Sequence, residues 1–368
     1  FKIKNYFINN VLITFVYNFY ITAKLKKKHI SYDYKEIDTS KISQYKDNDY
    51  SYGKGRNLII IIVESFNESV INYKINNKEV CPNINKLYSD SNNIATCFKE
   101  QIKIGVSSDG HFIVNTGLLP LEEKAVVWNI DKYLPSLVKS LKYDNSSIFT
   151  TDSKYFWSQN ATSIYYGYKE NYCKEIIKMQ SECDEVLDKE VFDYGINKIK
   201  ESKEPFIAQF VTISMNIPFH HIKEEKDWIM AADSIDMDAR KYLNCVNYFD
   251  NCLGNFLKEL KAIGKYENTV IAIMGDHCVQ YKKFKLYSNH CPLIIMNSGC
   301  PSEKIPHSEN MQQIDIYPTL LDLMGGNEYG WKGLGHSIFR SDEPNDEEYL
   351  YGLSRKLILS EYFKYNRF

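Results

Sequence analysis

The stretch NLIIIIVES (residues 57–65) is an unbroken run of apolar, mostly β-branched residues that ends in a glutamate and a serine. Continuous runs of this kind are typical of a strand that is buried on both faces. We therefore expect this stretch to form a central strand of a covered sheet, with Glu64 at its carboxyl end.

Similar runs recur along the chain, and helical stretches lie between them. The runs are residues 146–152, 205–214, 268–277 and 292–299, and the helical stretches are 184–202, 239–263 and 311–324. Strands that alternate with helices favour the α/β class, with a mostly parallel central sheet flanked by helices on both sides. The 368 residues are enough for one large domain of this class or for two ordinary ones.

Changes in composition and in hydrophobic periodicity along the chain predict four segments. We expect a catalytic domain over residues 56–341 and a C-terminal extension over 342–368. Residues 29–55 are polar and have no clear period, which favours a linker. Residues 1–28 are predicted to form a juxtamembrane helix.

The first segment carries no acidic or basic residue from Tyr6 to Ala23, and a basic run follows it. Three asparagines interrupt it, so it is marginal as a spanning helix, which needs about 20 predominantly apolar residues. An amphipathic helix at a bilayer surface fits its aromatic and basic residues better, and a helix packed on the domain is the alternative. Because the chain begins with Phe rather than Met, we expect it to be a piece of a longer protein.

Charge and cysteine usage exclude some classes of function. The formal charge of −2 and the pI of about 6.5 lack the basic character that is typical of proteins that bind nucleic acid. Nine cysteines are present without a CxxC pair, which argues against a structural zinc cluster. The pairs Cys173–Cys183 and Cys245–Cys252 are close enough in sequence for disulfides in an oxidising compartment, and apolar packing is the alternative for these side chains.

Two of the apolar runs end in side chains that bind metals. The first ends at Glu64 and the fourth at Asp276 and His277. The carboxyl ends of strands are where sites form in open α/β sheets, and these groups suit Zn²⁺ or Mn²⁺. A hydroxyl in GVSSDGHF (residues 105–112) would complete the set. Taken separately, Glu64 also fits a salt bridge, and the serines also fit a helix cap.

Several motifs in fixed order carry a resemblance to a known family. The chain resembles the sulfatase-like branch of the alkaline phosphatase superfamily, and within it the lipoteichoic acid synthases and related phosphoglycerol and phosphoethanolamine transferases. The resemblance runs from about Asn57 to Phe339. It rests on NLIIIIVESF, GVSSDGHF with NTGLLP, VTISMNIPF, MGDH, QIDIYPTLLDLMG and GHSIF.

The resemblance implies a nucleophile and one metal site. The family pattern places the nucleophile at Ser107 rather than Ser108, and the metal ligands at Glu64, Ser107, Asp276 and His277. A divalent ion on the serine oxygen would lower its pKa, and a helix that begins near Ser108 would favour the phosphate anion. The implied cofactor is one Mn²⁺ or Zn²⁺ ion, with Mg²⁺ or Ca²⁺ as alternatives.

Four further positions are implied to bind the substrate, and three of them depart from the family. Asn216 stands where a histidine is common, Gln159 where an arginine would clamp phosphate, and His111 where the family often has Gln or Glu. Trp157 is retained as a wall for the head group, with core packing as its alternative. An amide cannot shuttle a proton or replace a guanidinium, so these changes bear on the substrate.

The resemblance implies a membrane-anchored transferase with an extracytoplasmic catalytic domain. It would move a phosphoglycerol or phosphoethanolamine head group from a phospholipid to a glycan or lipid acceptor through a covalent Ser107 intermediate. The alternatives are a phosphodiesterase of the same fold and a catalytically degenerate binding protein. A true sulfatase is disfavoured, because SSDGH lacks the Pro and Arg of the formylglycine motif C/S-x-P-x-R.

Overall fold

The computed structural model describes residues 32–40, 42, 45–181, 186–280, 286–366 and 368. Its centre is a seven-stranded sheet with the strand order β4-β9-β8-β1-β7-β5-β6. In chain order the strands are β1 (Asn57–Val63), β4 (Ile94–Lys99), β5 (Asn145–Thr150), β6 (Glu170–Tyr172), β7 (Phe206–Val211), β8 (Thr269–Gly275) and β9 (His290–Met296). β1 pairs in parallel with both β7 and β8, so the stretch that opened the sequence analysis lies in the middle of the sheet.

Strand β1 is buried along its whole length because each of its faces packs into a separate core. Leu58, Ile60 and Ile62 contribute to one core, and Ile59, Ile61 and Val63 contribute to the other. Alternate side chains of a strand point to opposite faces, so a sheet covered on both sides requires apolar residues at every position. The expected buried central strand is confirmed.

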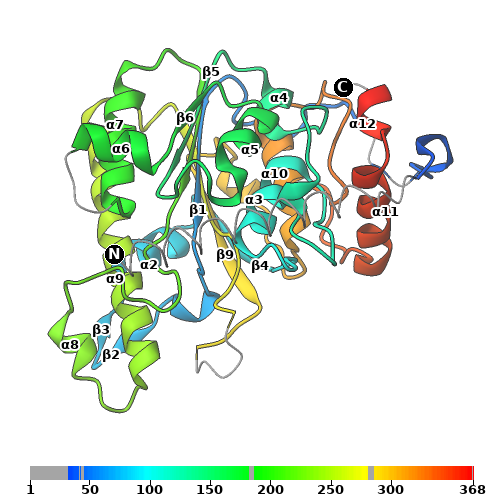
Figure 1. Cartoon of the computed structure of the whole chain (residues 1–368). Helices are drawn as coiled ribbons and strands as arrows, with labels where there is room; N and C mark the ends of the chain where they lie inside the picture. Colours follow the sequence, from blue (N-terminus) through cyan, green and yellow to red (C-terminus); the bar gives the residue numbers. More distant parts are fainter. Residues whose placement is uncertain (1–31, 41, 43–44, 182–185, 281–285, 367) are drawn as a thin grey trace, which may run out of the picture.

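Helices cover both faces of the sheet (Figure 1). One face carries α2 (Pro82–Ser89), α6 (Lys174–Ser181), α7 (Asp188–Glu201) and the long α9 (Met237–Ala262). The other carries α3 (Ser107–Thr116), α4 (Leu137–Leu141), α5 (Gln159–Tyr166), α10 (Ile316–Leu323), α11 (Glu347–Leu359) and α12 (Tyr362–Tyr365). The predicted α/β class, with a mostly parallel sheet between two helical layers, is confirmed. A small hairpin of β2 (Lys74–Ile75) and β3 (Lys78–Glu79) and the short α8 (Asp227–Met230) extend from one end of the sheet (Figure 1).

The sheet contains two strands that the apolar runs do not predict. Alternate residues of β4 are buried and half-buried, as in an edge strand, and β6 is a short polar strand at the opposite edge. Neither forms a continuous apolar run. β9 runs antiparallel to both β8 and β4, a direction that side-chain composition does not encode.

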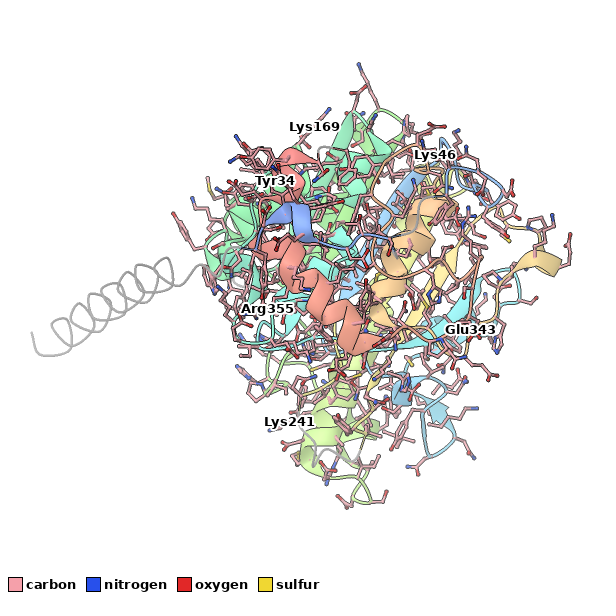
Figure 2. All side chains as sticks on the ribbon, turned by 90° about the vertical axis from the view of Figure 1, so that its right-hand side faces the viewer. Tyr34, Lys46, Lys169, Lys241, Glu343 and Arg355 are labelled. Atoms are coloured by element: carbon pink, nitrogen blue, oxygen red, sulfur yellow. The ribbon has the colours of Figure 1, made fainter. Side chains whose placement is uncertain are left out.

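The linker and the C-terminal extension pack together on the α3 side of the domain (Figure 2). Tyr34 in the linker stacks on Tyr365, with ring centroids 4.7 Å apart. Ile37 and Leu353 join the same core from the two segments. The predicted juxtamembrane helix at residues 1–28 lies outside the described residues. Among the residues that are described, no helix is long and apolar enough to cross a membrane.

One of the considered disulfides is wrong. Cys245 and Cys252 both lie in α9 as free, buried thiols. Residues seven apart on a helix are separated by roughly 10 Å along its axis, beyond the reach of a disulfide. Cys173 is also a buried free thiol, while Cys183 lies outside the described residues.

Candidate active site and metal centre

The pairing of β1 with β8 brings the two acidic strand ends together. Val63 is in register with Gly275, so Glu64 and Asp276 leave the sheet side by side. The Asp276 N–H donates to the carbonyl of Val63 at 3.0 Å, which continues the ladder by one residue. Both carboxylates are buried, with Asp276 fully enclosed.

Ser107 reaches these groups from the first turn of α3. Its Oγ donates to Glu64 Oε2 at 3.1 Å and lies 3.0 Å from His277 Nε2. The helix can approach so closely because Gly110 lies against Asp276, where a Cβ would meet the Asp276 carbonyl oxygen at 2.4 Å. Val106, just before the serine, has a positive φ of 45°, which is costly for a β-branched residue. Ser107 is thus presented on a strained turn.

Ser108 and Asp109 hold the turn that presents Ser107. The Ser108 hydroxyl donates to the Gly105 carbonyl at 2.8 Å, and the Asp109 carboxylate accepts from the N–H groups of Lys103 and Gly105. The N–H groups of Ser108 and Asp109 themselves donate within the turn. These two N–H groups are therefore already used within the turn, and the helix dipole is what this end of α3 offers to an anion.

The orientation of His277 is set by its other ring nitrogen. Nδ1 lies 2.7 Å from the carbonyl oxygen of Cys278, which only accepts, so Nδ1 carries the proton and donates. Nε2 of the neutral ring then presents a lone pair to the site, as in a metal ligand. Hydrogen bonds also position Glu64. Its Oε1 accepts from the Ser65 hydroxyl, and its backbone N–H donates to Thr212 Oγ1.

The donor set fits a divalent cation. Atoms of Glu64, Asp276 and His277 lie within 4.8 Å of one another, and all three residues are buried. Asp276 Oδ2 is buried, has no hydrogen-bond partner among the described residues, and lies 3.4 Å from His277 Nε2. The Ser107 hydroxyl has a single proton to share between a carboxylate and an imidazole lone pair. The site thus has more acceptor atoms than hydrogen-bond donors to satisfy them, and these acceptors are carboxylate oxygens and an imidazole nitrogen. Such atoms match the ligand preferences of Mn²⁺ and Zn²⁺.

The electrostatics agree with this fit. Burial, and then the neighbouring Glu64 carboxylate, raise the pKa of Asp276 well above its usual value. Burial works against a charged His277, but the carboxylates of Asp276 and Glu64 prevail and raise its pKa. Two buried carboxylates this close repel each other unless a proton or a cation lies between them.

His111 lies one turn along α3 from Ser107. It faces the four candidate metal ligands Glu64, Ser107, Asp276 and His277, which together are called the metal group below. Its Nε2 is 4.0 Å from Asp276 Oδ2 and has no hydrogen-bond partner within the described part of the chain. Burial lowers the pKa of His111 to about 4, so the ring is neutral at neutral pH. The structure thus brings this predicted substrate residue close to the metal group.

Asn216 also reaches the site. Its Nδ2 donates to Glu64 Oε1 at 3.1 Å, from the turn that follows β7. An amide here can orient Glu64 and donate to a substrate oxygen, but it cannot transfer a proton. His220 and His221 stack on each other past this turn, with ring centroids 5.0 Å apart.

Trp157 and Gln159 come from the segment after β5. Trp157 has a positive φ of 45° and packs beside the exposed Trp128, with ring centroids 6.4 Å apart. Gln159 is buried at the start of α5. Across the described residues, neither side chain forms a hydrogen bond with Glu64, Ser107, Asp276 or His277.

Asp152 is a further acid at the carboxyl end of β5 that the sequence analysis did not single out. Burial, and then the charge of Glu64, raise its pKa to about 7, while Lys174 opposes the shift. Asp152 is half-buried, and the effect of the Glu64 charge on its pKa indicates that it lies near the same site. The signal was available, because Asp152 follows an apolar strand just as Glu64 and Asp276 do.

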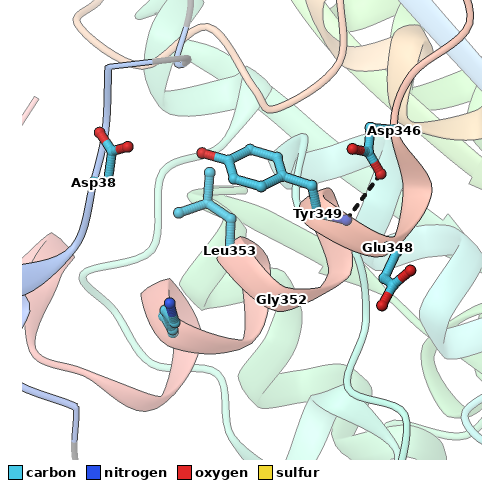
Figure 3. A pocket seen from close by; sticks show the side chains of 7 residues that line it. Asp38, Asp346, Glu348, Tyr349, Gly352 and Leu353 are labelled. Carbon is cyan, nitrogen blue, oxygen red and sulfur yellow. Dashed lines mark hydrogen bonds between the residues drawn. The ribbon is translucent and has the colours of Figure 1, made fainter.

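A surface pocket of about 400 Å³ lies elsewhere, between the linker and α11 (Figure 3). The N–H of Tyr349 donates to Asp346 at its rim. The lining residues are Asp38, Asp346, Glu348, Tyr349, Gly352, Leu353 and Lys356. Because it shares no residue with the metal group, this pocket is not the place of the chemistry.

The fold and the group of side chains define a class of protein. A parallel sheet whose strand ends place two carboxylates and a histidine around a helix-terminal serine is the arrangement that the resemblance to the alkaline phosphatase superfamily implied. The chain belongs to the sulfatase family, whose model, described as Sulfatase, matches residues 56–326. The family membership confirms the enzyme class predicted from the sequence, the sulfatase-like branch of that superfamily.

Curated relatives point to one part of this family. The chain is 30% identical over 336 residues to the lipoteichoic acid synthase-like protein YvgJ of Bacillus subtilis, a match that covers 84% of this chain and 53% of the relative. It is 27% identical over 334 residues to the lipoteichoic acid synthase of Staphylococcus aureus, covering 83% and 51%. The chain therefore spans about half the length of the curated relatives it matches.

Solved structures share the fold. The lipoteichoic acid synthase LtaP from Listeria monocytogenes superposes with a TM-score of 0.68 at 22% identity, covering 84% of this chain and 80% of that one. The phosphoglycerol transferase GacH of Streptococcus pyogenes, in complex with sn-glycerol-1-phosphate, superposes with a TM-score of 0.58 at 13% identity, covering 89% and 94%. At these identities the likeness establishes the fold.

Proposed function

We propose that this chain is the catalytic part of a metal-dependent transferase. It moves a phosphorylated head group, of the phosphoglycerol or phosphoethanolamine type, from a phospholipid to a glycan or lipid acceptor. The observation that carries the proposal is the position of Ser107 Oγ, 3.1 Å from Glu64 Oε2 and 3.0 Å from His277 Nε2. The lipoteichoic acid synthases among its relatives support this choice of reaction.

The residues would divide the work as follows. Glu64, Asp276, His277 and Ser107 would hold one Mn²⁺ or Zn²⁺ ion, with Mg²⁺ or Ca²⁺ as alternatives. When bound, the ion lowers the pKa of the serine hydroxyl and offsets charge on the phosphoryl group. The turn held by Ser108 and Asp109 keeps Ser107 at the start of α3, where the helix dipole favours the phosphate anion.

The reaction would proceed in two displacements. Ser107 Oγ bonds to phosphorus while the bond from phosphorus to the diacylglycerol oxygen breaks, and that oxygen takes up a proton. An acceptor hydroxyl then bonds to phosphorus, loses its proton and releases Ser107. The serine thus carries a covalent phospho-ester between the two steps.

Asn216, Trp157, Gln159 and His111 would contact the head group. Asn216 has an amide beside Glu64, and the Nε2 of neutral His111 has no hydrogen-bond partner in the part of the chain that the structure describes. Trp157 would form an aromatic wall. With Gln159 in place of a guanidinium, the phosphate would be held by neutral donors and the metal, so we expect weak ground-state binding of the donor.

A lipid donor requires the domain to work beside a bilayer. We propose that the whole protein is membrane-anchored and that this domain lies on the extracytoplasmic side. The apolar segment from Tyr6 to Ala23, with the basic run that follows, supports such an anchor.

The test is the intact mass of the protein after incubation with a phosphoglycerol or phosphoethanolamine lipid and Mn²⁺. Wild type is expected to gain the mass of one head group, and Ser107→Ala is expected to gain none. Ser108→Ala is the matched control for the neighbouring hydroxyl: it weakens the turn that presents Ser107, so the adduct should form more slowly but should still form. An adduct on Ser107→Ala, or its loss in Ser108→Ala alone, would refute the assignment of the nucleophile.

A second measurement separates transfer from hydrolysis. Release of the head group is followed with and without a glycan or glycolipid acceptor. A transferase gives an extended acceptor and little free glycerol phosphate. Free glycerol phosphate at the same rate in both samples would make the protein a phosphodiesterase instead.

A further inference from the structure

Two cysteines meet directly behind the metal group. Cys278 Sγ and Cys291 Sγ lie 3.4 Å apart, and both side chains are fully buried. Cys278 follows the predicted metal ligand His277, and Cys291 is the second residue of β9. The contact joins the end of β8 to the neighbouring antiparallel strand.

The surrounding backbone holds both residues in place. The Cys278 N–H donates to Glu100 Oε2 at 2.7 Å, and its thiol lies 3.2 Å from the His290 carbonyl. Gly275 at the end of β8 packs on Cys291, where a Cβ would meet the Cys291 Cβ at 2.8 Å. The two sulfurs are therefore kept next to each other by packing on both sides.

The other thiols of the described residues have different partners. Cys97 lies 3.3 Å from the Tyr88 hydroxyl, Cys81 donates to the Val70 carbonyl, and Cys245 lies 3.8 Å from the Phe219 carbonyl. Among the cysteines that the structure describes, Cys278 and Cys291 alone bring sulfur against sulfur.

We propose that Cys278 and Cys291 form a disulfide when the domain folds in an oxidising compartment. The two thiols lose two protons and two electrons as the sulfur–sulfur bond forms. The electrons pass to a disulfide of a thiol oxidant, such as oxidised glutathione or a protein disulfide oxidase, which becomes two thiols. Because both cysteines are buried in the folded domain, the bond forms during folding, while the thiols are still accessible.

The bond would fix the segment that carries the metal ligands. It ties the residue after His277 to β9, so that Asp276 and His277 are anchored on both sides. A short ring, residues 278–291, is closed, which reduces the freedom of the unfolded chain. The inference does not depend on which head group is transferred.

The test compares the whole chain made in an oxidising compartment with the same chain made in a reducing one. Each sample is denatured in the presence of an alkylating agent, so that buried free thiols are also blocked, and the digest is analysed without reduction. We expect a peptide linked through Cys278 and Cys291 in the oxidised sample only. The melting temperature of the intact oxidised protein should be higher than that of the reduced protein by roughly 5 °C.

Two variants complete the design. Cys291→Ala should abolish both the linked peptide and the difference in melting temperature between the two samples, while Cys300→Ser, which removes a half-buried thiol elsewhere, should keep both. Alkylation of both cysteines in the denatured oxidised protein would overturn the proposal. So would a second equivalent of bound zinc that is lost in Cys291→Ala, because Glu100 and the two thiols would then form a metal site.

Discussion

The proposed metal side of the site (Glu64, Ser107, Asp276 and His277) and its proposed head-group side in the segment after β5 (Trp157 and Gln159, with the nearby acid Asp152) follow strand ends at the same end of the sheet but are held differently. On the metal side, each group has hydrogen-bond partners and follows a buried strand or begins a helix packed against one. On the head-group side, Trp157 lies in a partly exposed aromatic group, and a neutral amide stands where the family has a cation. This difference supports the proposal that the chain carries out the family's reaction on a differently recognised donor.

We expect the largest effect when a charged side chain on the metal side is neutralised. Asp276→Asn should lower metal affinity by at least about 100-fold, because the change removes a charged ligand from a buried site. Metal content after dialysis and a metal titration give the answer. Asp250→Asn, which alters another buried carboxylate that bonds to Asn83 and Ile84, is the control and should leave metal binding unchanged. Equal metal binding by wild type and Asp276→Asn would remove Asp276 from the site.

The next test concerns the charge of Asp152 on the head-group side. Its pKa is about 7 in the folded metal-free protein, whereas the unfolded chain ionises near pH 4. Between these values the folded state keeps a proton that the unfolded state loses, so the stability of wild type falls as pH rises from 4 to 7. Asp152→Asn lacks this loss, and its stability relative to wild type should rise by roughly 3 kcal/mol over that range.

Urea unfolding of the metal-free protein at several pH values measures this effect. Asp144→Asn is the matched control, since the Asp144 side chain is 99% exposed and lies just before β5, at the other end of the strand from Asp152. It should follow the pH profile of wild type. A flat difference between Asp152→Asn and wild type would mean that Asp152 is already ionised near pH 4.

Restoring the cation on the head-group side should strengthen donor binding. Gln159→Arg places a guanidinium where the phosphate is expected, and a bidentate contact should lower KM for the phospholipid by about tenfold, or about 1.4 kcal/mol. Steady-state kinetics at constant salt measure it. Asn160→Arg adds the same charge at an exposed neighbour and should change KM little. The same decrease in both variants would indicate general attraction of the lipid rather than a phosphate contact.

The smallest expected effect comes from the strained turn on the metal side. Val106→Gly should raise the free energy of unfolding by about 1 kcal/mol, because glycine adopts the positive φ without strain. Turnover should fall in the same variant, since Ser107 is then less firmly presented. Lys142→Gly, at an ordinary left-handed C-cap, is the control and should change stability by only a few tenths of a kcal/mol. A less stable Val106→Gly would show that the turn is not strained.

Much of the fold followed from patterns in the sequence. The five apolar runs became β1, β5, β7, β8 and β9, because strands buried on both faces need apolar residues at every position. β4 and β6 were missed because edge strands bury fewer of their side chains. The Cys245–Cys252 pairing failed because the two residues share a helix, and spacing along the chain does not show that.

The sequence by itself determined which residues end the buried strands, since an acid straight after an apolar run stands out. Glu64, Asp276 and His277 were visible in this way, and Ser107 was predicted as the nucleophile from its motif. Only the tertiary structure decided that these residues meet. The strand order places β8 beside β1, and the close packing of Gly110 brings Ser107, 43 residues from Glu64 and 170 from His277, within hydrogen-bond distance of both. Contacts between distant residues depend on strand order and helix packing, which local patterns of hydrophobicity do not encode.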